Sequence, residues 1–143
     1  MEPADSEERL APDWFLAALV RLANESDMEL GVTLSTGGVL VSGVLVSGRR
    51  YFAHMREAFR TFTISEEPSG SEAAEAIFRQ AGAEDSAPPL RHLHLRGARF
   101  FAPGQVAIPA EPGMWWRGRL DAVDGWGLGL FAEGSPTLPL PRP

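Results

Sequence analysis

The chain has 143 residues, no cysteine and a formal net charge of -6 at pH 7. The absence of cysteine excludes disulfides, thiolate metal sites and cysteine nucleophiles. The first residues are acidic and no apolar run approaches the roughly 20 residues of a membrane span, so we expect neither a signal peptide nor a membrane anchor. With 44% hydrophobic and 22% charged residues, the composition is typical of a globular cytoplasmic protein.

Charge is distributed unevenly along the chain. Residues 64–88 contain six acidic residues and one arginine, whereas residues 89–120 contain five arginines and one glutamate. We therefore expect an acidic region and a basic region on the surface.

The chain is long enough for one domain, which we place at residues 12–132. Residues 1–11 are acidic and lack periodicity, so we expect a flexible arm there. Residues 133–143 are rich in proline and are expected to form a flexible tail.

The domain begins with patterns for a helix and a hairpin. Asp13 is a candidate N-cap for a helix whose apolar residues recur every three or four positions as far as Ala23. From Glu29 the period becomes two, and Thr36-Gly37-Gly38 separates two strand-like runs that end at Val46. The second run is apolar on both faces, which predicts a central strand covered on both sides.

Two further helices are expected between this hairpin and the next strand. Residues 49–62 have helical spacing and provide a candidate cover for the sheet. Their aromatic stripe, which we interpret as core, comprises Tyr51, Phe52, Phe59 and Phe62. Ser69 and Glu72 form a candidate capping box for a short helix that extends to about Ala81, followed by a loop at residues 82–89.

Three more strands are expected in the last third of the domain. Residues 90–101 alternate until Gly97, where the phase changes, which indicates a β-bulge. After a loop at residues 102–113, strands at residues 114–121 and 126–131 flank Asp124-Gly125, a pair typical of hairpin turns. The predicted fold is α+β, with a curved antiparallel five-stranded sheet or a partly open Sm-like barrel. It has an N-terminal helix and one or two helices inserted after the second strand.

The sequence contains few candidates for catalysis or metal binding. His92 and His94 would share one face of a strand, but too few other ligands are available for us to predict a metal site. Asp121 and Asp124 are close in sequence, yet turn chemistry explains Asp124 and pairing with a neighbouring arginine explains Asp121. We therefore predict no enzymatic activity, no catalytic or metal-binding residue and no cofactor.

The tryptophans and arginines near the C-terminus are better candidates for binding. Trp115 and Trp116 are consecutive, so they would face opposite sides of a strand and one of them is expected to be core. An exposed tryptophan beside Arg117 and Arg119 favours protein recognition, because these residue types dominate interface hot spots. The same residues could stack on single-stranded nucleic acid, which leaves an Sm-like nucleic-acid-binding module as the alternative.

Several segments together resemble the gas vesicle accessory protein U (GvpU) family. They are Val41-Ser42-Gly43, Tyr51-Phe52, His92-Leu93-His94-Leu95 and the block from Trp116 to Gly129. The last block is the most specific, since it combines tryptophan, Arg-Gly and Val-Asp-Gly at fixed spacing. The resemblance covers roughly residues 14–131.

The resemblance implies a non-enzymatic cytoplasmic protein that acts in gas vesicle assembly, organisation or clustering. Its expected partners are the vesicle shell, other gas vesicle proteins or a second copy of the chain, and we do not expect a membrane or nucleic acid as partner. No catalytic or ligand residue follows from the resemblance. The candidate contact residues are Trp115, Trp116, Arg117, Arg119, Asp124 and Trp126.

Overall fold

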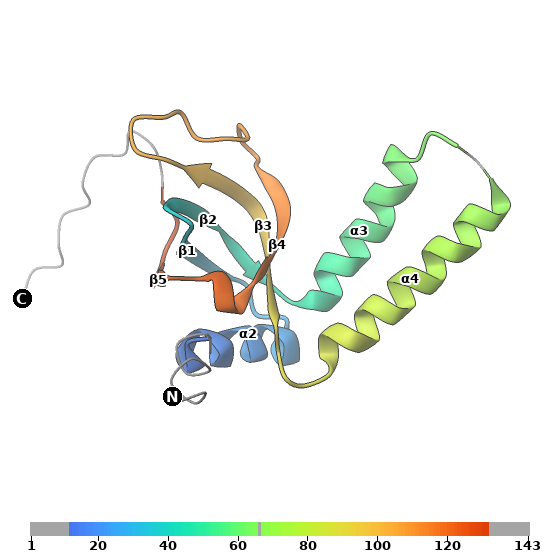
Figure 1. Ribbon diagram of the computed structural model, residues 1–143, viewed down its shortest axis with the longest axis horizontal. Coiled ribbons are helices and arrows are strands. Elements are labelled where there is room, and N and C mark those ends of the chain that lie inside the picture. The colour runs from blue at the N-terminus through green and yellow to red at the C-terminus, as the bar shows by residue number, and fades with distance from the viewer. Residues whose placement is uncertain (1–11, 66, 132–143) are drawn as a thin grey trace, which may run out of the picture.

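The computed structural model describes residues 12–65 and 67–131, and the predicted arm and tail at residues 1–11 and 133–143 lie outside this range. A first helix is followed by two strands, a helical hairpin and three more strands (Figure 1). Every strand pair is antiparallel. The order across the sheet is β4 (Met114–Arg119), β3 (His92–Phe101), β2 (Val39–Val46), β1 (Leu30–Thr36) and β5 (Gly125–Leu128). The predicted α+β fold with an open five-stranded sheet is therefore confirmed. Within the described residues, no helix combines the length and apolarity needed to span a bilayer.

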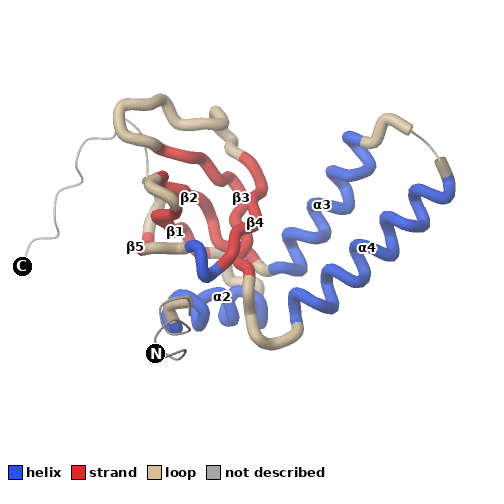
Figure 2. Tube along the Cα trace, in the orientation of Figure 1, coloured by secondary structure: helices blue, strands red, loops and turns tan. Residues whose placement is uncertain are grey.

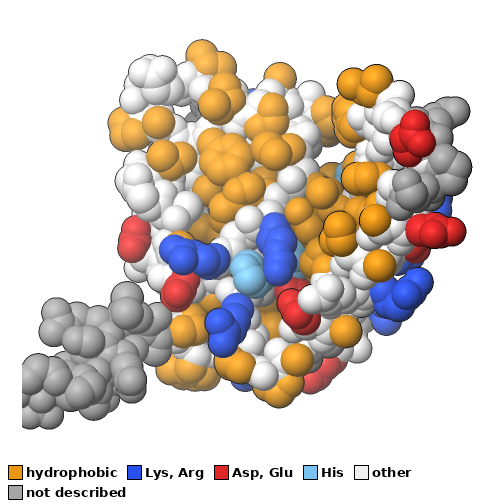
Figure 3. All heavy atoms as spheres, turned by 45° about the vertical axis from the view of Figure 1, so that its right-hand side comes forward, with side chains coloured by type: hydrophobic (Ala, Val, Ile, Leu, Met, Phe, Trp, Pro, Cys, Tyr) orange, Lys and Arg blue, Asp and Glu red, His pale blue; other side chains and the backbone are white. Residues whose placement is uncertain are grey.

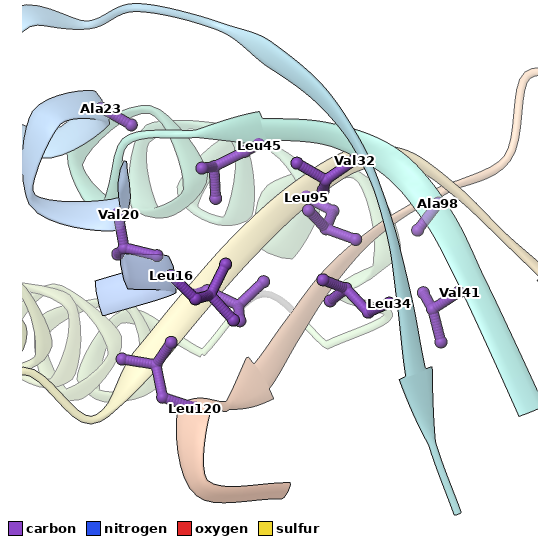
Figure 4. Close-up of a cluster of buried hydrophobic side chains, with 11 residues drawn as sticks. Leu16, Val20, Ala23, Val32, Leu34, Val41, Leu45, Leu95, Ala98 and Leu120 are labelled. Carbon is purple, nitrogen blue, oxygen red and sulfur yellow. The ribbon is translucent and has the colours of Figure 1, made fainter. Parts of the chain in front are cut away.

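Helix α2 (Trp14–Ser26) covers one face of the sheet, which we call the inner face. Its predicted cap is confirmed, since the Asp13 carboxylate accepts a hydrogen bond from the Phe15 N–H at 3.2 Å. The buried residues Leu16, Val20 and Ala23 recur at helical spacing and contact the sheet (Figure 4). The apolar stripe of this helix therefore closes one side of the core.

Strands β1 (Leu30–Thr36) and β2 (Val39–Val46) form the predicted hairpin. Gly37 and Gly38 both have positive φ angles, 59° and 82°, which a two-residue turn of this kind requires. Strand β2 lies at the centre of the sheet, as its apolar sequence predicted. On the inner face around it, Leu34, Val41 and Leu45 belong to the same buried cluster as the α2 side chains (Figure 4).

Strand β3 (His92–Phe101) contains the predicted bulge. Ser42 pairs with Arg99 and Val44 with Arg96, so one residue of β2 faces two residues of β3. Gly97 has a φ of 63° at this point. Because the bulge changes the phase, buried side chains continue from Leu95 to Ala98 rather than to residue 97.

Strands β4 (Met114–Arg119) and β5 (Gly125–Leu128) do not form the predicted hairpin. They lie at opposite edges of the sheet, where β4 pairs with β3 and β5 pairs with β1. The short 3₁₀ helix η1 (Leu120–Ala122) connects them and buries Leu120 in the core. The Asp124 N–H then donates to the Ser35 carbonyl, so Asp-Gly begins a strand instead of closing a turn.

Helices α3 (Gly48–Phe62) and α4 (Pro68–Ser86) form a hairpin that extends away from the sheet (Figures 1 and 2). Helix α4 begins at Pro68 with Glu67 at its N-cap, so the predicted cap at Ser69 is wrong by two residues. The helix continues to Ser86, through most of the predicted loop. The prediction that α3 covers the sheet, with its aromatic stripe as core, holds only at the base of the hairpin. Tyr51 is buried there, whereas Phe59 packs against Phe78 of α4 and Phe62 is 81% exposed.

Candidate functional site

The alternation of β4 divides the predicted contact residues between two faces. Trp116 packs against the core on the inner face, with its ring 6.0 Å from that of Phe100. Trp115, Arg117 and Arg119 lie on the opposite, outer face, because their side chains alternate with Trp116. The expectation that one of the two consecutive tryptophans belongs to the core is confirmed.

The outer face of β4 also contacts the base of the helical hairpin. The Trp115 ring stacks on His54 of α3, with 4.2 Å between ring centroids and 9° between planes. The Arg119 side chain is 69% exposed, and its Nε lies 3.5 Å from the Asp121 carboxylate, the pairing that the sequence suggested for Asp121. Figure 3 shows arginine, histidine and acidic side chains together on one face, beside a larger area of hydrophobic side chains.

Arg117 belongs to a buried polar cluster that we call the joint, formed by Tyr51, Asp85, His94 and Arg117. Arg117 Nη1 lies 3.6 Å from Asp85 Oδ1, and His94 Nε2 lies 4.0 Å from the same oxygen. The guanidinium also covers the ring of Phe52 at 5.4 Å. The joint thus connects α3, α4, β3 and β4, and it holds the Arg117 side chain, which is 30% exposed, against the base of the helical hairpin.

The joint has unusual electrostatics. His94 is 1% exposed, and burial lowers its pKa to about 3, with a further contribution from the positive charge of Arg117. Burial also raises the pKa of the Asp85 carboxyl, against the opposing effect of Arg117. Neither ring nitrogen of His94 has a hydrogen-bond partner among the described residues. The cluster is therefore a desolvated polar contact between the helical hairpin and the sheet.

The remaining two predicted residues lie at the other edge of the sheet. Asp124 is exposed immediately before β5. Trp126 packs beside the core and donates a hydrogen bond from its indole Nε1 to the Asp13 carboxylate at 2.6 Å. The six predicted residues therefore do not form a single surface, although Trp115, Arg117 and Arg119 do share one face.

The structure also places the histidines that the sequence singled out. His92 and His94 share the outer face of β3, but His92 Nδ1 lies 3.2 Å from Nη2 of Arg117. Within residues 12–65 and 67–131, no group of three or more His, Cys, Asp or Glu side chains is arranged to hold a metal ion.

The joint could not be identified from local sequence signals. Asp85 falls in the segment predicted to be a loop. Its partners His94 and Arg117 lie 9 and 32 residues further along the chain. Tyr51, His94 and Arg117 were each singled out in the sequence, but for separate reasons, and no pattern predicted that they meet.

The family model described as Gas vesicle protein GvpU-like matches residues 13–131, which include both the helical hairpin and all five strands. The chain belongs to the GvpU-like family. This protein is accordingly a gas vesicle-related protein. No curated protein and no solved structure matches it.

The GvpU-like match begins at the cap of α2 and ends just after β5. It therefore covers the core, the joint and the outer face of β4 as parts of one family unit. In this GvpU-like protein, the inserted helical hairpin lies inside the matched range.

Proposed function

We propose that the protein is a non-enzymatic gas vesicle accessory protein that acts through contacts with the vesicle shell or with other gas vesicle proteins. The family match over residues 13–131 is the observation that carries this proposal. In that role the protein assists the assembly, organisation or clustering of gas vesicles and associates with them in the cytoplasm.

The contact surface that we propose is the outer face of β4 around Trp115 and Arg119. Trp115 is partly exposed and held flat by its stack on His54, so little side-chain entropy is lost when a partner covers it. Arg119 extends from the same face and is largely exposed. Tryptophan and arginine side chains in this arrangement are typical of interface hot spots. Arg117 supports this surface through the joint.

The experiment compares binding of purified gas vesicles by wild type, Trp115→Ala and Arg119→Ala, measured as protein recovered with the buoyant vesicles. Trp14→Ala and Arg60→Ala are matched controls, because Trp14 is an exposed ring on α2 and Arg60 is an exposed, carboxylate-paired arginine on α3. We expect the two β4 variants to lose at least about tenfold in affinity, as removal of a hot-spot side chain does. The controls should bind like wild type.

Two results would contradict the proposal at different levels. If the β4 variants and their controls bind equally well, the assignment of the surface is wrong. If wild type binds RNA instead of vesicles, with affinity that falls steeply above about 150 mM salt, the nucleic-acid alternative is favoured.

A further inference from the structure

A cleft of about 730 Å³ lies between α2 and the base of the helical hairpin. The C-terminal half of α2 forms one wall, and α3 and α4 form the others. Among the residues that line it are Arg21, Arg49, Phe52, Arg56, Phe78 and Arg79. A hydrogen bond from the Gly48 N–H to Asn24 Oδ1, 2.9 Å long, joins α2 to α3 at its edge. The cleft shares no residue with the surface of Trp115 and Arg119.

The lining of this cleft is rich in arginine. Four arginines line it, beside the carboxylates of Glu25 and Asp85. Arg49 and Arg56 are already paired with Asp27 and Glu75. Arg21 and Arg79 are exposed and stand on different helices.

Arg21 and Arg79 have no carboxylate within 4.0 Å among the residues the structure describes. Two cations on separate walls can pair with two carboxylates of one ligand without breaking an existing ion pair.

The surface between the charged residues is largely apolar. Phe52 and Phe78 contribute aromatic rings, whereas small residues at positions 53, 82 and 83 leave room for a backbone to approach. A Cβ atom added at Gly82 would meet no heavy atom within 4 Å. An α-helix with an apolar stripe fits such a groove between helices, with anchors at positions i, i+3, i+4 and i+7.

We propose that this cleft binds an amphipathic α-helix of another protein. The apolar stripe of that helix lies on Phe52 and Phe78, and acidic residues beside the stripe pair with Arg21 and Arg79. The choice of a helix follows from the three helical walls, which a fourth helix would complete, and the choice of acidic flanks follows from the two unpaired arginines. This second binding surface goes beyond the proposed function and does not depend on the face of β4.

The first test uses a fluorescein-labelled peptide of about 18 residues, or five helical turns, with leucine at the anchor positions and glutamate beside them. Its binding to the full chain is followed by fluorescence anisotropy, and we expect saturable binding. Gly82→Phe places a bulky ring in the open space of the cleft and should weaken binding at least about tenfold. Gly70→Phe is the matched control on the same helix, since only Glu67 Cβ lies near that position, at 3.9 Å.

The second test reverses the charge. Arg21→Glu combined with Arg79→Glu should weaken binding of the glutamate peptide at least about tenfold and strengthen binding of a peptide with lysine at the same positions. Arg119→Glu, outside the cleft, should change neither. The proposal is overturned if wild type binds neither peptide, if it binds both equally, or if Gly82→Phe binds like Gly70→Phe. Retained vesicle binding in any of these cases would leave the proposed function standing.

Discussion

Replacement of His94 by leucine should change how stability depends on pH. His94 lies in the joint, where Asp85 faces it from α4, Tyr51 from α3, Arg117 from β4 and His92 from its own strand. Its pKa is lowered to about 3 in the folded protein, against 6.5 for an ordinary histidine. Leucine is similar in size to histidine but has no titratable group, so it can fill this position, which is 1% exposed, without taking up a proton.

The sign and size of the effect follow from the two pKa values. Because the unfolded chain takes up a proton at His94 near pH 6.5 and the folded protein does not, acidification stabilises the unfolded state. The contribution of His94 to stability is therefore complete above pH 6.5 and is lost as the pH falls from 6.5 toward 3. The slope is about 1.4 kcal/mol per pH unit, so wild type should lose about 2 kcal/mol more than His94→Leu between pH 7 and pH 5.

The raised pKa of the Asp85 carboxyl acts in the opposite direction, because the folded protein then takes up that proton first. Asp85 is present in both proteins, so its effect largely cancels in the comparison.

Urea unfolding of both proteins at pH 7, 6 and 5 measures this difference by linear extrapolation. Parallel pH profiles for the two proteins would refute the reasoning. A wild type that gains stability relative to His94→Leu on acidification would also refute it, because His94 would then be charged and paired with Asp85. If the variant does not fold, NMR titration of the wild-type imidazole decides the question, since protonation between pH 6 and 7 in the folded state contradicts the expected desolvation.

Three further predictions concern packing and capping. Gly48→Ala should lower the free energy of unfolding, measured by denaturant titration, by about 1–3 kcal/mol, because the added Cβ would overlap the Asp85 carboxylate. Gly125→Ala is the control. No atom lies within 4 Å of its added Cβ, so it should change the free energy of unfolding by less than about 0.5 kcal/mol. Leu34→Ala should lower the free energy of unfolding by about 2–5 kcal/mol in the same titration, because Leu34 is fully buried. A loss below about 1 kcal/mol would show that the neighbouring side chains collapse into the cavity. Asp13→Ala should lower Tm, because it removes both the cap of α2 and the acceptor of the Trp126 indole hydrogen bond. Asp13→Asn should keep most of the cap and lower Tm less. Equal Tm values for wild type and both variants would show that the cap is unimportant.

Local patterns were sufficient to predict the elements whose neighbours are close in sequence. The β1–β2 hairpin followed from Gly37 and Gly38, and the bulge followed from the change of phase at Gly97. The separation of Trp115 from Trp116 followed from strand alternation alone. In each case the side chains near the element determine its geometry.

Long-range pairing could not be predicted in the same way. The Asp124-Gly125 pair is typical of a hairpin turn, but burial of Leu120 turns the chain across the end of the sheet and directs β5 to β1. Similarly, the aromatic stripe of α3 indicated a buried face without showing that much of it lies toward α4. The joint depends on Asp85 and Arg117 meeting across elements, which no spacing in the sequence encodes.

The most direct test of the account is recovery of the protein with purified gas vesicles. Wild type should float with the buoyant vesicles, and Trp14→Ala and Arg60→Ala should float like wild type. At the same protein concentration, a much smaller share of Trp115→Ala and Arg119→Ala should be recovered with the vesicles. Recovery of wild type in the fluid alone, in the presence of intact vesicles and their associated proteins, would contradict the proposal that this GvpU-like protein acts through contacts with them.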